Sequence, residues 1–188
     1  MEIKTHEAKV LGEKCTIDLM HFSKSDGKVW KGLFDSWKNL KFGLRDFKTR
    51  EPNLPEGLSE VAFCLWSGSG RMLKKKKGGA SSSFDTFNLK TGKAEQIKAS
   101  SVEEDLTSFG PKSKWDDIYF LDFYNGGKLD GTFNVYKISN KLIKSVKVNK
   151  DQTFEDQQKE KRRPRFSITK DIIKKKKIEP IAKNVKVW

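Results

Sequence analysis

Residues 81–100 read SSSFDTFNLKTGKAEQIKAS and predict a β-hairpin. Two runs in which apolar and polar residues alternate flank a Thr-Gly turn, which is the pattern of paired antiparallel strands. Because side chains alternate between the two faces of a strand, Gln96 and Lys98 share one face. The turn folds the first run back, which can bring Asp85 beside both of them. The hairpin therefore predicts a carboxylate, an amide and an ammonium group gathered on one face.

These three side chains are suited to metal-dependent cleavage of a phosphodiester bond. Mg²⁺ prefers hard oxygen ligands, which the Asp85 carboxylate, the Gln96 side chain and the backbone carbonyl of Ile97 can supply. Such an ion activates water and offsets negative charge in the transition state, while Lys98 orients or helps to deprotonate the water. We expect Mg²⁺ as the cofactor, with Mn²⁺ able to replace it. Glu95 points to the other face, so it is an alternative ligand that a β-bulge or a one-residue shift would turn inward.

The segments around the hairpin predict an α/β domain with a mixed sheet. Residues 28–47 space apolar side chains at helical intervals, and residues 50–70 place prolines before an apolar stretch that ends in Ser-Gly-Ser-Gly, the order of a helix start and stop. The apolar run 117–124 predicts a central strand, and the alternating run 131–139 predicts its neighbour. No repeat or linker is evident, so residues 1–188 form one predicted domain. The side chains expected to face the core from the first helix are Trp30, Leu33, Phe34, Trp37 and Leu40.

The charge of the chain indicates a polyanionic partner. The 188 residues carry a formal net charge of +14 and give a pI of about 9.7, so nucleic acid is the expected ligand, ahead of an anionic membrane surface. No apolar run approaches the roughly 20 residues of a membrane span, and the N-terminus has no signal-peptide core, which predicts a cytoplasmic protein. Cys15 and Cys64 are expected to be reduced core residues. With only His6 and His21 besides, any metal is expected to have oxygen ligands.

Two stretches outside the hairpin are candidates for DNA binding. The loop 108–117 offers side chains for phosphate or base-edge contacts, although it equally fits a solvated loop with Trp115 in the core. In 161–165, KRRPR, the arginine forks can bind phosphate or guanine in a bidentate way. The four-lysine runs 74–77 and 174–177 are expected to supply nonspecific affinity or solubility. The candidates are Ser108, Lys112, Ser113, Lys114, Arg162, Arg163 and Arg165, with the basic C-terminal segment 159–188 contributing.

The hairpin and its flanking segments resemble a known nuclease superfamily. Asp85 followed by Gln-Ile-Lys at 96–98 is similar to the PD-(D/E)xK signature, with Phe-Asp in place of Pro-Asp and glutamine in place of the usual acidic residue. The segments LPEGLSEVAF, SSSFDTFNLKTGKAEQIKASS, DLTSFGPKSKWDDIYFLDF and RRPRFSI together resemble small type II restriction endonucleases of this superfamily. The resemblance covers roughly residues 50–175 and is greatest to the group that cleaves the interrupted palindrome GCNGC.

The resemblance implies a role for each residue of the site. Asp85 corresponds to the principal metal ligand, Gln96 to the second acidic position and Lys98 to the catalytic lysine. Glu60, in a predicted helix, is similar to the helix glutamate that many members place near the metal, and it can restore the negative charge that Gln96 lacks. Glu95 ranks below Gln96, because the family pattern leaves one residue before the lysine. The competing interpretation makes all of these side chains solvated polar groups of an edge hairpin.

The resemblance thus implies an α/β nuclease with the PD-(D/E)xK core, a mixed β-sheet flanked by helices. Its expected reaction is Mg²⁺-dependent hydrolysis of double-stranded DNA that leaves 5′-phosphate and 3′-hydroxyl ends. A short palindromic target is most easily read by a two-fold symmetric homodimer, and a companion DNA methyltransferase is expected in the cell. A structure-selective repair nuclease is the alternative within the nucleases. A noncatalytic basic nucleic-acid-binding protein is the alternative outside them.

Overall fold

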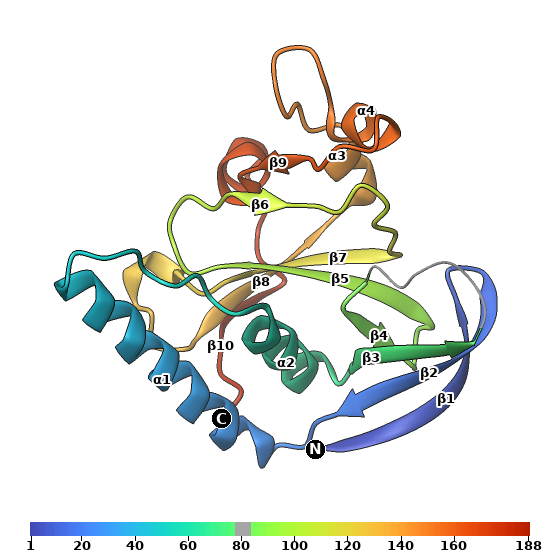
Figure 1. Cartoon of the computed structure of the whole chain (residues 1–188), viewed down its shortest axis with the longest axis horizontal. Coiled ribbons are helices and arrows are strands. Elements are labelled where there is room, and N and C mark those ends of the chain that lie inside the picture. Colours follow the sequence, from blue (N-terminus) through green and yellow to red (C-terminus); the bar gives the residue numbers. More distant parts are fainter. Residues whose placement is uncertain (78–83) are drawn as a thin grey trace.

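The computed structural model describes residues 1–77 and 84–188, with only the backbone described at 74–77. The start of the predicted hairpin, 81–83, and the lysine side chains of 74–77 lie outside the described residues. The chain forms one large mixed sheet with two long helices on one face and a small sheet with short helices on the other (Figure 1). The predicted α/β class, a mixed sheet flanked by helices, is confirmed.

The main sheet has eight strands in the order β1-β2-β3-β4-β5-β7-β8-β10. Neighbouring strands pair antiparallel except β5 and β7, which are parallel. A parallel pair requires a crossover connection, so residues 101–116 pass over the sheet and carry β6 (Thr107–Ser108), which pairs with β9 (Arg165–Phe166). The eight strands span Glu2–Val10, Glu13–His21, Gly70–Lys77, Thr86–Asn88, Lys93–Ser100, Asp117–Asp122, Phe133–Ile138 and Ala182–Val185.

The predicted hairpin is formed by β4 and β5. Thr86 pairs with Glu95, and Oδ1 of Asn88 accepts hydrogen bonds from two backbone N–H groups of the turn. Gly92 adopts a φ of +66°, a left-handed conformation that glycine enters without a steric penalty. β5 lies between β4 and β7, so the hairpin is internal to the sheet. The interpretation as a solvated edge hairpin is wrong, since Glu95 and Gln96 are 2% and 4% exposed.

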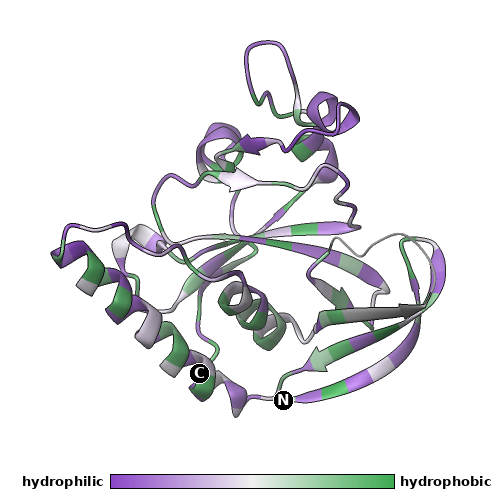
Figure 2. Ribbon diagram, viewed as in Figure 1, coloured by the Kyte–Doolittle hydropathy of each residue, from purple (hydrophilic) through white to green (hydrophobic). Residues whose placement is uncertain are grey.

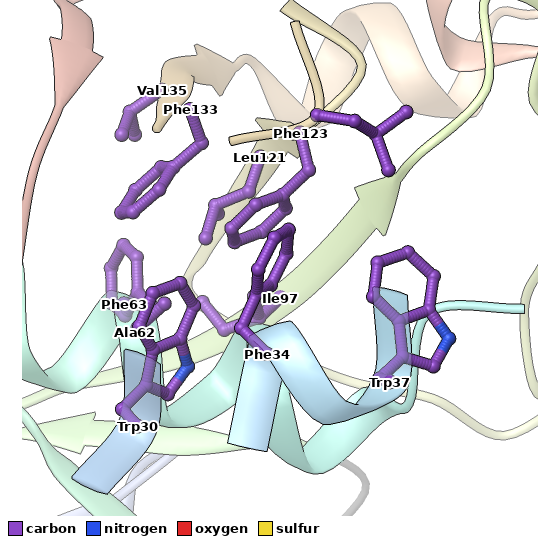
Figure 3. Packing of buried hydrophobic residues seen from close by; sticks show 11 residues of the cluster. Trp30, Phe34, Trp37, Ala62, Phe63, Ile97, Leu121, Phe123, Phe133 and Val135 are labelled. Carbon is purple, nitrogen blue, oxygen red and sulfur yellow. The ribbon is translucent and has the colours of Figure 1, made fainter. Parts of the chain in front are cut away.

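Two helices, α1 (Asp26–Asp46) and α2 (Glu56–Ser67), cover one face of the sheet with aromatic side chains (Figure 3). The ring centroid of Phe34 lies 5.3 Å from that of Trp30 and 5.9 Å from that of Phe123 in the connection after β7. Aromatic side chains bury large areas, which makes this cluster the main source of apolar burial on that face.

The prediction for α1 is correct for its aromatic residues and wrong for its leucines. Trp30 and Trp37 are buried, whereas Leu33 and Leu40 are 57% and 56% exposed. At 3.6 residues per turn, the leucines fall on a second stripe that lies roughly a third of a turn from the aromatic one. The second stripe therefore has no partner within the described residues of this chain.

The start and stop signals of α2 are confirmed. Pro55 precedes the helix, and Gly68 ends it with a φ of +76° and an N–H that donates to the carbonyl of Cys64 at 2.9 Å. Cys64 and Cys15 are both free and buried, as the sequence predicts. Burial raises the pKa of the Cys64 thiol, and the nearby carboxylates of Glu95, Glu60 and Asp85 raise it further.

The opposite face of the sheet is covered by residues from the crossover and from the C-terminal third. Asp105 is buried and accepts hydrogen bonds from the hydroxyls of Thr107 and Ser167 and from the N–H groups of Ile168 and Thr169. This single carboxylate joins β6 to the start of a π-helix. The remaining helical elements are the 3-10 helix η1 (Asn125–Gly127), α3 (Asn140–Lys144), α4 (Phe154–Lys159) and the π-helix η2 (Thr169–Lys174).

The C-terminal residues return to the first helix. β10 pairs with β8, and the indole of Trp188 stacks on that of Trp30 with centroids 5.8 Å apart. Gly27 permits this approach, because a Cβ there would lie 1.8 Å from the carbonyl oxygen of Val187. Hydrophobic and hydrophilic residues alternate along much of the sheet (Figure 2). Within the described ranges, no helix combines the length and apolar character needed to cross a membrane.

Candidate active site

Asp85 lies where β3, β4 and β5 meet, immediately before β4. Its backbone carbonyl accepts the N–H of Met72 at 2.9 Å, and its own N–H donates to the carbonyl of Glu95 at 3.0 Å. Its Oδ2 accepts the N–H of Ile97 at 2.7 Å and also the side-chain amide of Gln96. Backbone and side-chain bonds therefore fix the carboxylate at this junction, in direct contact with the glutamine that the hairpin pattern placed beside it.

The surroundings of Asp85 disfavour a negative charge. The pKa of its carboxyl is raised to about 7, chiefly by burial; the N–H of Ile97 opposes this shift, the carboxylate of Glu60 adds to it, and the ammonium of Lys98 opposes it. A positive charge beside Asp85 would lower the pKa of this carboxyl and favour its ionised form. The environment therefore fits a bound cation beside Asp85 better than an uncompensated carboxylate.

Gln96 and Lys98 extend the site along β5. Lys98 is half-buried, and its Nζ lies 5.3 Å from the ring centroid of Phe109, a buried residue that follows β6. An ammonium over an aromatic face is attracted by the ring quadrupole, which gives Lys98 a defined direction toward the β6–β9 side. Its effect on the pKa of Asp85 shows that the two charges are within electrostatic range. The structure thus brings all three hairpin residues into one site.

Glu95 is separated from this site by strand parity. Its Oε2 accepts the hydroxyl of Thr86 at 2.9 Å, on the face of the sheet opposite Gln96. Burial raises the pKa of Glu95, and the nearby polar side chains of Ser69, Thr86 and Asn88 oppose that shift. The pairing of β5 with β7 is continuous from Glu95 onward, without the bulge that would turn this side chain toward Asp85.

Glu60 approaches the site from α2 but is held by an arginine. Its Oε2 accepts Nε of Arg71 at 2.5 Å, and the side chains are 12% and 31% exposed, respectively. Arg71 lies in β3, one residue before Met72, which bonds to Asp85. The negative charge that Glu60 brings to the site is thus already compensated. The sequence pattern gave no sign of Arg71, because this ion pair forms only when α2 packs against β3.

The oxygen donors available to a cation are of mixed type. Among residues 1–77 and 84–188, no three His, Cys, Asp or Glu side chains form a group that could hold a metal ion. The side chains with oxygen at the junction are those of Asp85 and Gln96, with Glu60 behind them. Gln96 turns its amide nitrogen toward Asp85, so its oxygen would face a cation beside Asp85 only after rotation of the amide. An ion that keeps several waters and accepts carbonyl oxygen, such as Mg²⁺, fits this set, whereas Zn²⁺ would require more nitrogen or sulfur ligands.

The β6–β9 ribbon joins the two predicted DNA-binding stretches. Ser108 pairs with Arg165, and the N–H of Phe109 donates to the carbonyl of Pro164 at 3.0 Å. The Arg165 side chain is exposed. Lys98 lies over the ring of the buried Phe109, and this contact links the hairpin residues to the ribbon that carries Arg165.

The other predicted DNA-binding residues lie around this ribbon. Lys112 and Lys114 line a groove of 510 Å³ between the crossover and α3 and α4. Arg162 and Arg163 are exposed, and Nε of Arg162 lies 3.3 Å from the carboxylate of Glu160. Their DNA contacts remain predictions.

Comparison with known proteins places these residues in a nuclease family. Residues 22–175 match a family described as Bsp6I restriction endonuclease. Over 150 residues, the chain is 37% identical to the type II restriction enzyme Bsp6I of Bacillus sp. (strain RFL6), which covers 78% of this chain and 80% of that enzyme. The chain matches no solved structure. It therefore belongs to the Bsp6I restriction endonuclease family and is a site-specific deoxyribonuclease.

Proposed function

We propose that the protein hydrolyses both strands of DNA at a short palindromic site in a reaction that requires Mg²⁺, with Mn²⁺ able to replace it. The products carry 5′-phosphate and 3′-hydroxyl ends. The observation that carries this proposal is the meeting of Asp85, Gln96 and Lys98 at one strand junction in a restriction endonuclease family member. The interrupted palindrome GCNGC is the proposed target, and a companion methyltransferase would protect the same site in the host.

In the proposed site, Asp85 supplies the charged ligand, and Gln96 and the carbonyl of Ile97 supply neutral oxygen ligands. When bound, the ion provides positive charge for the scissile phosphate and for activation of water. Lys98 orients the attacking water or accepts its proton, and its contact with Phe109 limits the directions that the ammonium can take. Glu60 tunes the charge of the site through its ion pair with Arg71.

The DNA is proposed to lie along the surface between the hairpin residues and the β6–β9 ribbon. Lys112 and Lys114 would contact phosphates, which fix the register of a protein on DNA without reading its sequence. The Ser108 hydroxyl oxygen is buried, so the predicted contact of this residue with DNA does not fit the structure. Arg162, Arg163 and Arg165 would read base edges or bind phosphates in a bidentate way. The formal charge of +14 favours association with DNA at low salt.

Digestion of plasmid and linear DNA tests the proposal. Wild-type protein with Mg²⁺ or Mn²⁺ should give discrete fragments, and EDTA or the substitution Asp85→Asn should abolish them. End sequencing then reports the target and the cut positions, and parallel digestion of methylated DNA reports the effect of base modification. Cleavage confined to branched or mismatched DNA would support a repair nuclease instead. Binding of DNA without any strand scission would refute the proposed reaction.

A further inference from the structure

The outer stripe of α1 carries large apolar side chains along its length. Its large members are Val29, Leu33 and Leu40 in the helix and Phe47 directly after it, whose exposed fractions are 54%, 57%, 56% and 79%. The helix lies at the periphery of the molecule, and hydrophobic bands recur along it (Figures 1 and 2). Exposed apolar residues scattered over a surface are ordinary, but a continuous stripe on one helix marks an interaction site.

The spacing of this stripe is that of a helix-pairing seam. Ser36 and Gly43 fill the gaps between its large members, so that the six positions are separated alternately by four and three residues. Apolar positions that repeat every 3.5 residues on average face a second helix in coiled-coil packing. None of the six positions carries a charge. The cores of protein interfaces are likewise depleted of charged residues.

Two glycines inside α1 give an independent indication of a close neighbour. Gly32 and Gly43 lie within the helix, where each glycine costs about 1 kcal/mol relative to alanine. A Cβ added at either position would meet no other atom within 4 Å. Contacts within the described residues of this chain therefore do not explain why these two positions are glycine. A helix from another molecule that packs closely against α1 would explain the glycines, since small residues permit close backbone approach.

We infer that the stripe pairs with the same stripe of a second copy of this chain, with the two α1 helices antiparallel. In this orientation Val29 of one copy lies opposite Phe47 of the other, Leu33 opposite Gly43, and Ser36 opposite Leu40. The layers of Leu33 with Gly43 and of Ser36 with Leu40 then each combine a large with a small residue, while the two end layers pair valine with phenylalanine. A parallel pair would instead place leucine against leucine and glycine against glycine, which leaves alternating crowding and voids. A self-complementary seam is what a two-fold interface requires.

The size of the seam suits this partner. α1 has 21 residues and is about 32 Å long. Its four large side chains expose on the order of 400 Å² of apolar surface, comparable with the largest patches on monomers. A stable dimer buries about 800 Å² per partner, so the stripe supplies about half of that area. The inference deepens the proposed cleavage of a palindromic site by naming a contact between two subunits, and it rests on that proposal only for the action of the dimer on DNA.

The test measures oligomeric state without DNA or metal, so that it is independent of the proposed reaction. Analytical ultracentrifugation of the full chain should show a dimer, and Leu33→Glu should weaken dimerisation by about 30-fold or more. Lys38→Ala, on another face of α1, is the matched control and should leave the dimer unchanged. A wild-type protein that stays monomeric at tens of micromolar, or a dimer unaffected by Leu33→Glu, would overturn the inference.

A size exchange tests the antiparallel register. Gly43→Leu places two leucines in one layer, so it should weaken dimerisation even though it removes a glycine from the helix. The double variant Leu33→Ala with Gly43→Leu restores one large and one small residue per layer and should recover at least tenfold of the lost affinity. Both sites are open in the monomer, and thermal unfolding should confirm that each variant folds. If the double variant dimerises no better than Gly43→Leu, the antiparallel pairing is wrong.

Discussion

The ionised carboxylate of Asp85 is proposed to bind the metal, but without a metal it destabilises the folded state. Its folded-state pKa of about 7 lies above the unfolded value of about 3.9. The folded state therefore binds this proton more tightly, and the resulting stabilisation is present at low pH and lost as the pH rises through about 7. Asp85→Asn keeps an acceptor for the N–H of Ile97 without the charge. In EDTA at pH 8 the variant should have a Tm at least about 2–4 °C above that of the wild type, with the difference vanishing near pH 4.

The same comparison of Tm values after addition of Mg²⁺ tests whether a cation binds beside Asp85. A cation that binds beside Asp85 stabilises the folded state by mass action, so Mg²⁺ should raise the Tm of the wild type at pH 8 and have little effect on Asp85→Asn. Cleavage by the variant should fall by about 100-fold or more. An equal effect of Mg²⁺ on the two Tm values would place the ion elsewhere.

Gln96 and Glu95 are neighbours in sequence with opposite predicted effects. Gln96→Ala should reduce cleavage by about tenfold or more, because it removes an oxygen from the site. Glu95→Gln should stay within a few-fold of wild-type activity, since its amide oxygen still accepts the hydroxyl of Thr86. Cleavage rates over a Mg²⁺ titration check both. Loss of activity in Glu95→Gln together with a silent Gln96→Ala would place the metal on the α2 face.

Gln96→Glu isolates the role of charge in the same position. The new carboxylate would touch Asp85, so in EDTA at pH 8 the variant should unfold at a lower temperature than the wild type. Mg²⁺ compensates both charges, so the concentration needed for half-maximal cleavage should stay equal or fall. A rise in that concentration would show that Gln96 acts by hydrogen bonding to Asp85 alone.

At the scale of elements, Asp105 determines how the crossover is attached to the C-terminal third. Asp105→Ala removes four hydrogen bonds, two of them from buried donors, so it should destabilise the protein by about 3 kcal/mol or more. Asp105→Asn keeps acceptor capacity and should cost less. Urea unfolding compares the two variants. Equal stability of Asp105→Ala and the wild type would show that β6 and η2 are held by apolar packing alone.

The elements also show which features a single sequence can specify. The β4–β5 hairpin follows from a local turn and a period of two, and it was predicted together with the contact between Asp85 and Gln96. α1 has two apolar stripes, and helical spacing alone could not tell that Trp30 and Phe34 face the sheet while Leu33 faces outward. Periodicity identifies candidate faces, but tertiary packing selects between them.

The contacts that the sequence did not predict have a common physical cause. Arg71 meets Glu60 only through the packing of α2 on β3, and Asp105 meets its partners across more than 60 positions of chain. Neither partner can be read from local spacing. The pairing of Ser108 with Arg165 was unpredictable for the same reason, although each residue was a separate candidate for DNA binding.

At the scale of the whole molecule, the sheet separates a structural face from a proposed DNA face. α1, α2 and Trp188 fill one side with aromatic packing, while Lys98 and the β6–β9 ribbon lie on the other. The C-terminal segment 159–188 belongs to both, since β10 joins the sheet and the arginines of 161–165 stay exposed. The contribution of that segment to DNA binding therefore depends on which of its exposed positive charges lie on the proposed DNA face.

Two charge-removal variants distinguish sequence reading from general attraction. One replaces the exposed Arg162, Arg163 and Arg165 by alanine; the other replaces the exposed lysines of 174–177. The arginine set should lose more affinity for specific DNA, because a bidentate pair discriminates by about 1–3 kcal/mol. Lys174 already lies 3.2 Å from the carboxylate of Glu103, which lowers what the lysine set can add.

Fluorescence anisotropy in EDTA, with a specific and a random duplex over a range of salt, separates the two contributions. Each lost phosphate contact should flatten the slope of log affinity against log salt by roughly 0.9, on both duplexes alike. Base readout should appear instead as a loss on the specific duplex at every salt concentration, with the random duplex affected only through the slope. The arginine variant should show both effects, since its side chains lie beside the ribbon that leads to Lys98. If it loses the same affinity on both duplexes, the arginines neutralise phosphate only, and sequence must be read from the crossover loop that carries Lys112 and Lys114.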